Sequence, residues 1–435
     1  MLYIILEAAA RWQGGGASFF SRVCYNGAEI PLCTKEGDAM ANLLDYLAWR
    51  GDLPLSAVPL CDVDALIFAR LSYVPFDGIA EARVPLYMAA RQVLASVQLS
   101  DAPRACGKED QQLLTQLLQS PRYADILLDG YENIFDPVRQ EQFAALTLHL
   151  PDGSAVVAFR GTDGTLVGWK EDFNMAFSTV VPAQLDAVRY LSDVAERTQG
   201  GIYLCGHSKG GNLAVYAAAF CAPEVQQRIL GVRNFDGPGF TQQVLSQTGF
   251  ARILPRVRTY LPRSSVVGML LEHEEAFTIV ESRSVGIYQH NVYQWEIARG
   301  GFVELQQLSA SSHLMDRALK DWVAAMPAED RGRVINGLYA ALSATQAETV
   351  RDVREHRKLA ALKAVMDLDP ETRALTLQAA RLLYQSLRRS MPQKDMRDVL
   401  EKLPIGALLD RLPFGGREDK KTDKEKDGGK SLPAS

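Results

Sequence analysis

The chain has 435 residues, of which 47% are hydrophobic and 23% are charged, a composition typical of a globular protein long enough for two or three domains. The formal net charge of −5 gives no basic excess for nucleic-acid binding, and no run of about 18 apolar residues predicts a transmembrane segment. The six cysteines lack paired metal-ligand spacing, so we expect no metal site and a reducing, cytoplasmic setting.

The first 39 residues make a poor start for a domain. Their short apolar segment follows no basic residue, which argues against a signal peptide, and a run of three glycines comes soon after it. Met40 instead opens an amphipathic helical pattern over residues 41–50. We therefore interpret residues 1–39 as an over-extended gene model or a disordered N-terminus.

The next part of the chain changes from helical to extended patterns. Residues 41–130 are mostly helical by pattern, as in the apolar spacing of residues 63–71. Residues 143–150 and 155–160 are β-prone and flank Asp152-Gly153, which favours a tight turn. These residues predict a β-hairpin.

Helices and strands then alternate. A helix is predicted over residues 183–198, a strand over 202–205, and further strands over 229–235 and 257–261. This order predicts an α/β fold with a mostly parallel sheet and helices on both faces. Beyond about residue 312 the pattern is helical again. The predicted division is an N-terminus of residues 1–39, an α/β domain of residues 40–310 with a helical N-terminal part, a helical region of residues 311–412 and a disordered charged tail of residues 413–435.

The most informative motif is Gly206-His207-Ser208-Lys209-Gly210. It follows an apolar strand and precedes the alanine-rich helical segment 212–221, which is the context of the Gly-x-Ser-x-Gly nucleophile elbow of α/β-hydrolases. Glycine at both flanking positions removes Cβ atoms that would collide in so tight a turn. The pattern predicts Ser208 as a nucleophile. An ordinary strand-to-helix turn with a serine cap is the alternative.

A serine nucleophile needs a base, and in α/β-hydrolases the base follows the serine in sequence. This order excludes His149, and His207 would flank the serine rather than face it. His313 and His356 fall in the later helical region. The strand-like run 285–289 places His290 in a loop beyond the last core strand, so we prefer His290.

His273, in a charged turn, remains the alternative base. The acid that orients the base is predicted at Asp236, because a carboxylate directly after a parallel strand lies at the catalytic edge of the sheet. An Asp-Gly turn without a catalytic role is the competing interpretation, and Glu272 and Glu274 are alternative acids. The glycine-rich segment 160–164 predicts a loop in which Thr162 and the backbone N–H of Lys209 form an oxyanion hole.

These motifs resemble those of a known family. Residues 159–162, followed by Trp169 and Asp172, and the elbow resemble the class 3 lipases, and the chain is more similar to a bacterial group of lipase-like α/β-hydrolases whose elbow is Gly-His-Ser-Lys-Gly-Gly-Asn. Further matching segments are residues 45–52, 169–173, 234–240, 265–271 and 289–290. The resemblance spans about residues 40–400 and implies that Ser208 is the nucleophile, His290 the base and Thr162 an oxyanion residue.

One departure concerns the acid. Class 3 lipases carry their aspartate after the strand that corresponds to residues 257–261, where this chain has Ser264-Ser265. We expect a serine hydrolase that cleaves carboxylic esters of small molecules or lipids without a cofactor. The alternatives are an acyltransferase or thioesterase with the same triad, or a catalytically weak binding or scaffold protein on a hydrolase fold. The sequence does not determine the oligomeric state.

Overall fold

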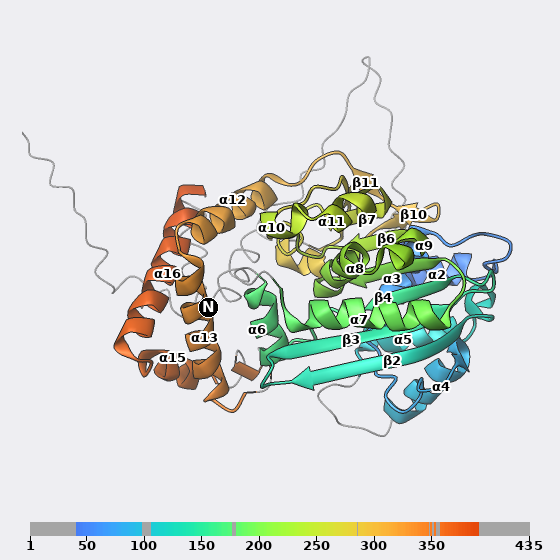
Figure 1. Cartoon of the computed structure of the whole chain (residues 1–435), viewed down its shortest axis with the longest axis horizontal. Coiled ribbons are helices and arrows are strands. Elements are labelled where there is room, and N and C mark those ends of the chain that lie inside the picture. The colour runs from blue at the N-terminus through green and yellow to red at the C-terminus, as the bar shows by residue number, and fades with distance from the viewer. Residues whose placement is uncertain are drawn as a thin grey trace, which may run out of the picture.

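The computed structural model describes residues 41–97, 106–175, 180–284, 286–347, 349, 352–353 and 357–390. A nine-stranded sheet in the order β1-β2-β3-β4-β5-β6-β7-β8-β11 forms its centre (Figure 1). Its strands are β1 (Val84–Pro85), β2 (Leu127–Asp136), β3 (Glu141–His149), β4 (Ala155–Phe159), β5 (Ile202–His207), β6 (Ile229–Phe235), β7 (Val257–Pro262), β8 (Phe277–Val280) and β11 (Glu304–Leu305). Neighbours from β4 to β8 pair in parallel, and the flanking strands pair antiparallel.

Strand β4 shows why the sheet is covered on both sides. Its five residues are all buried, as expected for a strand with helices on both faces. Val156 and Ala158 belong to one apolar core, whereas Val157 and Phe159 belong to the other. Successive side chains of a strand point to opposite faces, so the sheet separates two cores.

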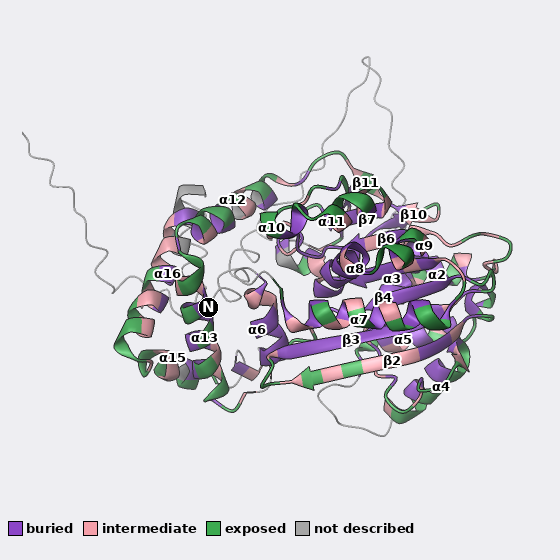
Figure 2. Ribbon diagram, viewed as in Figure 1, coloured by how far each residue is buried: buried purple, intermediate pink, exposed green. Residues whose placement is uncertain are grey.

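Helices cover both faces, and their inward sides are buried (Figure 2). The first core is closed by α2 (Leu43–Arg50), α3 (Asp62–Leu71), α4 (Leu86–Val97) and α5 (Lys108–Leu117). The second is closed by α7 (Pro182–Arg197), α8 (Lys209–Phe220), α10 (Gln242–Leu245) and α11 (Thr248–Ile253). The short helix α6 (Leu166–Asn174) follows β4, and α9 (Pro223–Arg228) precedes β6.

The last described helices pack together beside α6, on the side of the molecule away from α2 and α4 (Figure 1). They are α12 (Ala310–Ala324), α13 (Ala328–Ser343), α15 (Lys358–Met366) and α16 (Pro370–Ser390). The indole N–H of Trp322 in α12 donates to the carbonyl of Ala379 in α16 at 2.9 Å. At the start of α12, the hydroxyl of Ser312 donates to the carbonyl of Ser265, which ties this helical group to the loop after β7.

The predicted α/β architecture is confirmed, including the hairpin β3–β4 and the strand-helix order around the elbow. Strands β1, β2, β8 and β11 are not predicted; β1 and the first four residues of β2 fall in the segment 41–130, which is predicted as mostly helical. The strand-like interpretation of residues 285–289 is wrong, since Gly286–His290 forms a 3₁₀ turn, η4. Residues 1–39 and the charged tail lie outside the described residues, and the division into domains stays a prediction.

Candidate active site

Ser208 occupies a strained turn between β5 and α8. Its backbone angles are φ 58° and ψ −134°, a combination that a residue with a side chain rarely adopts. The sharp reversal carries the half-buried serine to the C-terminal end of β5. The structure therefore places Ser208 in the elbow that the sequence pattern predicts.

The two glycines of the elbow are required by close backbone packing. A Cβ atom added to Gly206 would lie 2.0 Å from the carbonyl oxygen of Gly210, and one added to Gly210 would lie 2.1 Å from that of Phe159. Contacts this short do not occur between real atoms, so a side chain at Gly206 would push α8 away from β5, and one at Gly210 would push α8 away from β4. The glycines hold the elbow against the end of the neighbouring strand.

Two backbone hydrogen bonds continue the sheet just beyond its strands. The N–H of Ser208 donates to the carbonyl of Phe235 at 2.9 Å, and the N–H of Asp236 donates to that of Tyr260 at 2.9 Å. Ser208 and Asp236 thus follow adjacent parallel strands, β5 and β6, at the same edge of the sheet. This edge is where open α/β sheets bind ligands.

Asp236 contacts His290 directly. The Nδ1 atom of His290 lies 2.6 Å from Oδ2 of the buried carboxylate of Asp236. The other carboxylate oxygen accepts the hydroxyl of Ser265 at 2.5 Å and the N–H of Gly268 at 3.2 Å. An ionised carboxylate only accepts hydrogen bonds, so we assign the proton of the neutral imidazole to Nδ1. The lone pair then lies on Nε2, the atom a general base uses.

The structure does not bring the alternative residues to this position. Glu272 and Glu274 are exposed, and neither bonds to His290. His273 pairs with Glu275 at 2.9 Å and donates from Nε2 to the carbonyl of Gly268 at 2.6 Å. His273 therefore supports the loop whose N–H binds Asp236, and it does not occupy the base position.

Ser265 belongs to the pair Ser264-Ser265, where the resemblance to class 3 lipases would place the aspartate. Its hydroxyl instead donates to Asp236, which comes from the strand next to β7. The carboxylate thus reaches the histidine from β6, and a serine from the loop after β7 helps to fix it.

The serine and the histidine are not hydrogen-bonded to each other. Among the described residues, neither Oγ of Ser208 nor Nε2 of His290 has a hydrogen-bond partner. Such bonds are often long in unliganded enzymes and shorten when the substrate binds.

The loop after β4 lies against the elbow. A Cβ atom on Gly161 would lie 2.9 Å from the Cβ of Ser208, so the loop passes directly beside the serine. The hydroxyl of Thr162 lies 2.7 Å from each carboxylate oxygen of Asp172 in α6. Burial raises the pKa of Asp172 to about 6, although the charge of Lys209 and the Thr162 hydroxyl oppose this shift. Asp172 fixes the Thr162 side chain in the loop that passes beside Ser208.

The backbone N–H and the side chain of Lys209 lie in different surroundings. Its N–H lies in the first turn of α8, where N–H groups have no acceptor within the helix. Its buried ammonium group is 2.6 Å from Oε2 of Glu171 and 2.7 Å from the carbonyl of Gln142. The side chain therefore joins α8 to α6 and is not part of the predicted oxyanion hole, which involves only the backbone N–H.

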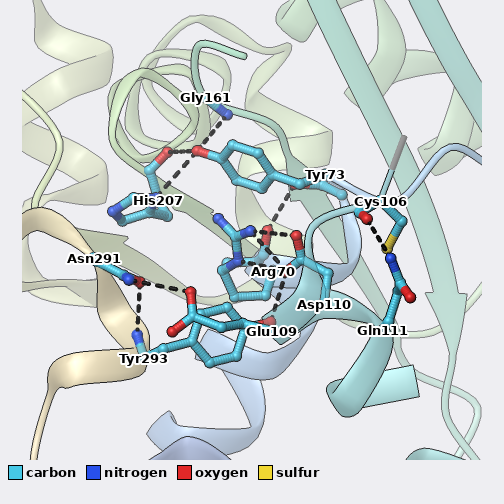
Figure 3. Close-up of polar contacts among 12 residues, drawn as sticks. Arg70, Tyr73, Cys106, Glu109, Asp110, Gln111, Gly161, His207, Asn291 and Tyr293 are labelled. Carbon is cyan, nitrogen blue, oxygen red and sulfur yellow. Dashed lines mark hydrogen bonds and ion pairs between the residues drawn. The ribbon is translucent and has the colours of Figure 1, made fainter. Parts of the chain in front are cut away.

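Tyr73, which follows α3, is a site residue that the sequence analysis missed. Its hydroxyl lies 3.1 Å from the Gly161 nitrogen and 3.1 Å from Nδ1 of His207 (Figure 3). No motif surrounds Tyr73 in the sequence. Only the packing of α3 against β4 and β5 brings it to the elbow.

Two further described histidines do not bond to Asp236 or His290. His149 pairs with Asp129 on β2, and His313 is exposed on α12. His356 lies outside the described residues. Within the described ranges, no group of three or more His, Cys, Asp or Glu side chains is placed to hold a metal ion, and no helix is long and apolar enough to cross a membrane.

A family model described as Mbeg1-like matches residues 117–340, just over half of the chain. The chain belongs to the Mbeg1-like family. The Mbeg1-like match contains Thr162, Ser208, Asp236 and His290, but it begins after Tyr73. A lipase-like family was expected from the sequence, and the match confirms that recognition.

Two solved structures are similar to this Mbeg1-like chain at low identity. M37 lipase is 12% identical, with 55% of this chain and 84% of that chain covered and a TM-score of 0.34. A triacylglycerol lipase from Penicillium expansum is 12% identical, with 59% and 96% covered and a TM-score of 0.31. A comparison with curated proteins found no match.

Proposed function

We propose that this protein is a serine hydrolase that cleaves carboxylic esters through an acyl-enzyme. The observation that carries the proposal is the contact between Nδ1 of His290 and the buried carboxylate of Asp236, which lies at the same sheet edge as the strained Ser208. A buried carboxylate on Nδ1 leaves Nε2 free to act as a base, and the elbow presents a half-buried hydroxyl. Neither feature is needed to stabilise an ordinary strand-to-helix turn.

The first half of the reaction forms the acyl-enzyme. The Oγ atom of Ser208 attacks the ester carbonyl carbon while Nε2 of His290 takes its proton. The N–H groups of Thr162 and Lys209 stabilise the oxyanion of the tetrahedral intermediate. When the intermediate collapses, the bond to the alcohol oxygen breaks and His290 returns the proton to the leaving alcohol.

The second half reverses these roles with water. His290 removes a proton from a water molecule, the water oxygen attacks the acyl carbon, and the bond to Ser208 breaks. The serine oxygen regains the proton, and the carboxylic acid leaves. Asp236 stabilises the imidazolium that forms in both halves and keeps the ring in the productive tautomer.

A fluorophosphonate probe tests the nucleophile directly. We expect it to label the wild-type protein and the control Ser246→Ala, in which an exposed serine is removed, but not Ser208→Ala. No labelling of the wild type, or equal labelling of Ser208→Ala, would contradict a serine hydrolase and would favour a binding or scaffold role. Rates with p-nitrophenyl esters of increasing acyl length then separate small-molecule esters from lipid-like ones.

A further inference from the structure

Tyr73 lies at the point where three parts of the proposed site meet. Its hydroxyl accepts the N–H of Gly161 in the oxyanion loop at 3.1 Å. The same oxygen lies 3.1 Å from Nδ1 and 3.2 Å from the carbonyl oxygen of His207 in the elbow (Figure 3). One side chain from the N-terminal helical layer thus contacts both the oxyanion loop and the elbow.

His207 extends this connection to the base. Its Nε2 lies 2.9 Å from the backbone carbonyl oxygen of His290, and the two imidazole rings are 4.5 Å apart. A carbonyl only accepts, so Nε2 of His207 carries a proton. Burial, followed by the charges of His290 and Arg70, lowers the pKa of His207 well below its usual value, which keeps the ring neutral. Nδ1 is then an acceptor without a proton, and the single hydroxyl proton of Tyr73 is shared between Nδ1 and the carbonyl oxygen of His207.

A second set of contacts fixes the tyrosine ring. The guanidinium of Arg70 lies 4.1 Å from the ring centre of Tyr73 and binds both oxygens of Asp110 at 2.7 and 2.9 Å. Asp110 also accepts the hydroxyl of Tyr293 at 2.6 Å. Figure 3 shows Arg70, Asp110 and Tyr293 in contact with one another. Tyr293 is three residues after His290, so this network also holds the segment that carries the proposed base.

We propose that Tyr73 and His207 are positioning residues, which hold the oxyanion loop, the nucleophile elbow and the base in one fixed arrangement. This inference rests on the proposed hydrolase function. The hydrogen bonds of Tyr73 and His207 end at two backbone groups. One is the N–H of Gly161, which precedes Thr162, and the other is the carbonyl of His290, the proposed base. A shift of about 1 Å in such groups can reduce a rate about 100-fold.

The first test removes only the tyrosine hydroxyl. In Tyr73→Phe, we expect kcat with a p-nitrophenyl ester and the rate of fluorophosphonate labelling to fall about 10- to 100-fold, with KM changed less than about twofold. Tyr190→Phe is the matched control, because Tyr190 is buried and its hydroxyl bonds to Gly130 and Thr147. We expect this control to lower Tm to a similar extent while keeping the wild-type kcat.

The second test uses His207 and separates position from stability. Glutamine retains an N–H that reaches the His290 carbonyl, whereas leucine does not. We therefore expect His207→Gln to keep more activity than His207→Leu at equal or lower Tm. ¹⁵N NMR of the wild-type histidines provides a readout independent of turnover, and we expect His207 to remain neutral with its proton on Nε2 between pH 5 and pH 8.

The outcomes separate the two proposals. If the wild type is labelled but Tyr73→Phe reacts at the same rate, the positioning role is wrong and the hydrolase function stands. A His207 ring that is charged, or protonated on Nδ1 alone, also overturns the positioning role. If the wild type is not labelled, the hydrolase function fails first, and the positioning role fails with it.

Discussion

Asp236 is the carboxylate that contacts His290. It approaches His290 from the end of β6, and Ser265 and Gly268 hold its second oxygen. The sequence suggested Asp236 only because it follows a strand. The same reasoning left Glu272 and Glu274 open, since a motif of two or three residues does not determine which loops meet in space.

Asp236→Asn should lower kcat about 10⁴-fold with little loss of folding, because an amide nitrogen next to Nδ1 favours the wrong imidazole tautomer. The measurement is ester turnover together with a near-UV circular dichroism spectrum. Glu272→Gln is the control and should keep wild-type activity. If Glu272→Gln lost most of its ester turnover and Asp236→Asn kept most of it, Asp236 would not be the acid.

Asp172 predicts a pH dependence of stability. Its pKa is raised to about 6 in the folded protein, so the folded state prefers the protonated carboxyl. The free energy of unfolding should therefore fall by about 2 kcal/mol at this group as pH rises from about 4 to about 6.

Asp172→Asn removes this titration. Relative to the wild type, the variant should become progressively more stable between pH 4 and pH 7, as measured by urea unfolding at several pH values. A difference in unfolding free energy that does not change with pH would show that Asp172 does not titrate in this range.

At the level of elements, the elbow was predictable and its surroundings were not. The strand, the two glycines and the alanine-rich helix are contiguous, so local pattern alone located Ser208. The sequence suggested a strand directly before His290, because the preceding residues include apolar ones. In the structure these residues form a 3₁₀ turn that contains His290 and do not pair with a strand. Tyr73 and Glu171 contact elements that are far away in the sequence, and a short sequence motif does not predict such contacts.

The buried ion pair of Lys209 and Glu171 joins α8 to α6. Lys209→Met would leave the Glu171 charge buried without its partner, so the free energy of unfolding should fall by about 3 to 5 kcal/mol. Adding Glu171→Gln should recover part of the loss. The exposed Lys320, 3.7 Å from Glu272, is the control, and Lys320→Met should cost less than about 1 kcal/mol. Equal losses in urea unfolding for both lysines would contradict the proposed contribution of the buried pair.

At the level of the whole molecule, the sequence predicted two layers of helices around a parallel sheet, but not how closely the N-terminal layer is built into the site. Helices α2 to α5 close one of the two cores; they also supply Arg70 and Asp110, and the turn after α3 supplies Tyr73. The helical pattern of residues 41–130 gave no indication of this, because the contacts join segments far apart in the chain.

A shortened chain tests this dependence. A chain that starts at Gly107 loses α2, α3 and α4 and uncovers apolar residues of the sheet such as Leu148 and Val156, so it should lose cooperative thermal unfolding. Cooperative unfolding of the chain from Gly107 would show that the N-terminal layer is an independent unit.

Because of its strained backbone angles, Ser208 lowers the thermal stability of the protein at the residue that the proposed activity requires. Glycine adopts positive φ without a steric cost, so Ser208→Gly should have a higher Tm than the wild type while losing the nucleophile. A search for heat-resistant forms of this protein that did not also screen for turnover would therefore favour inactive ones.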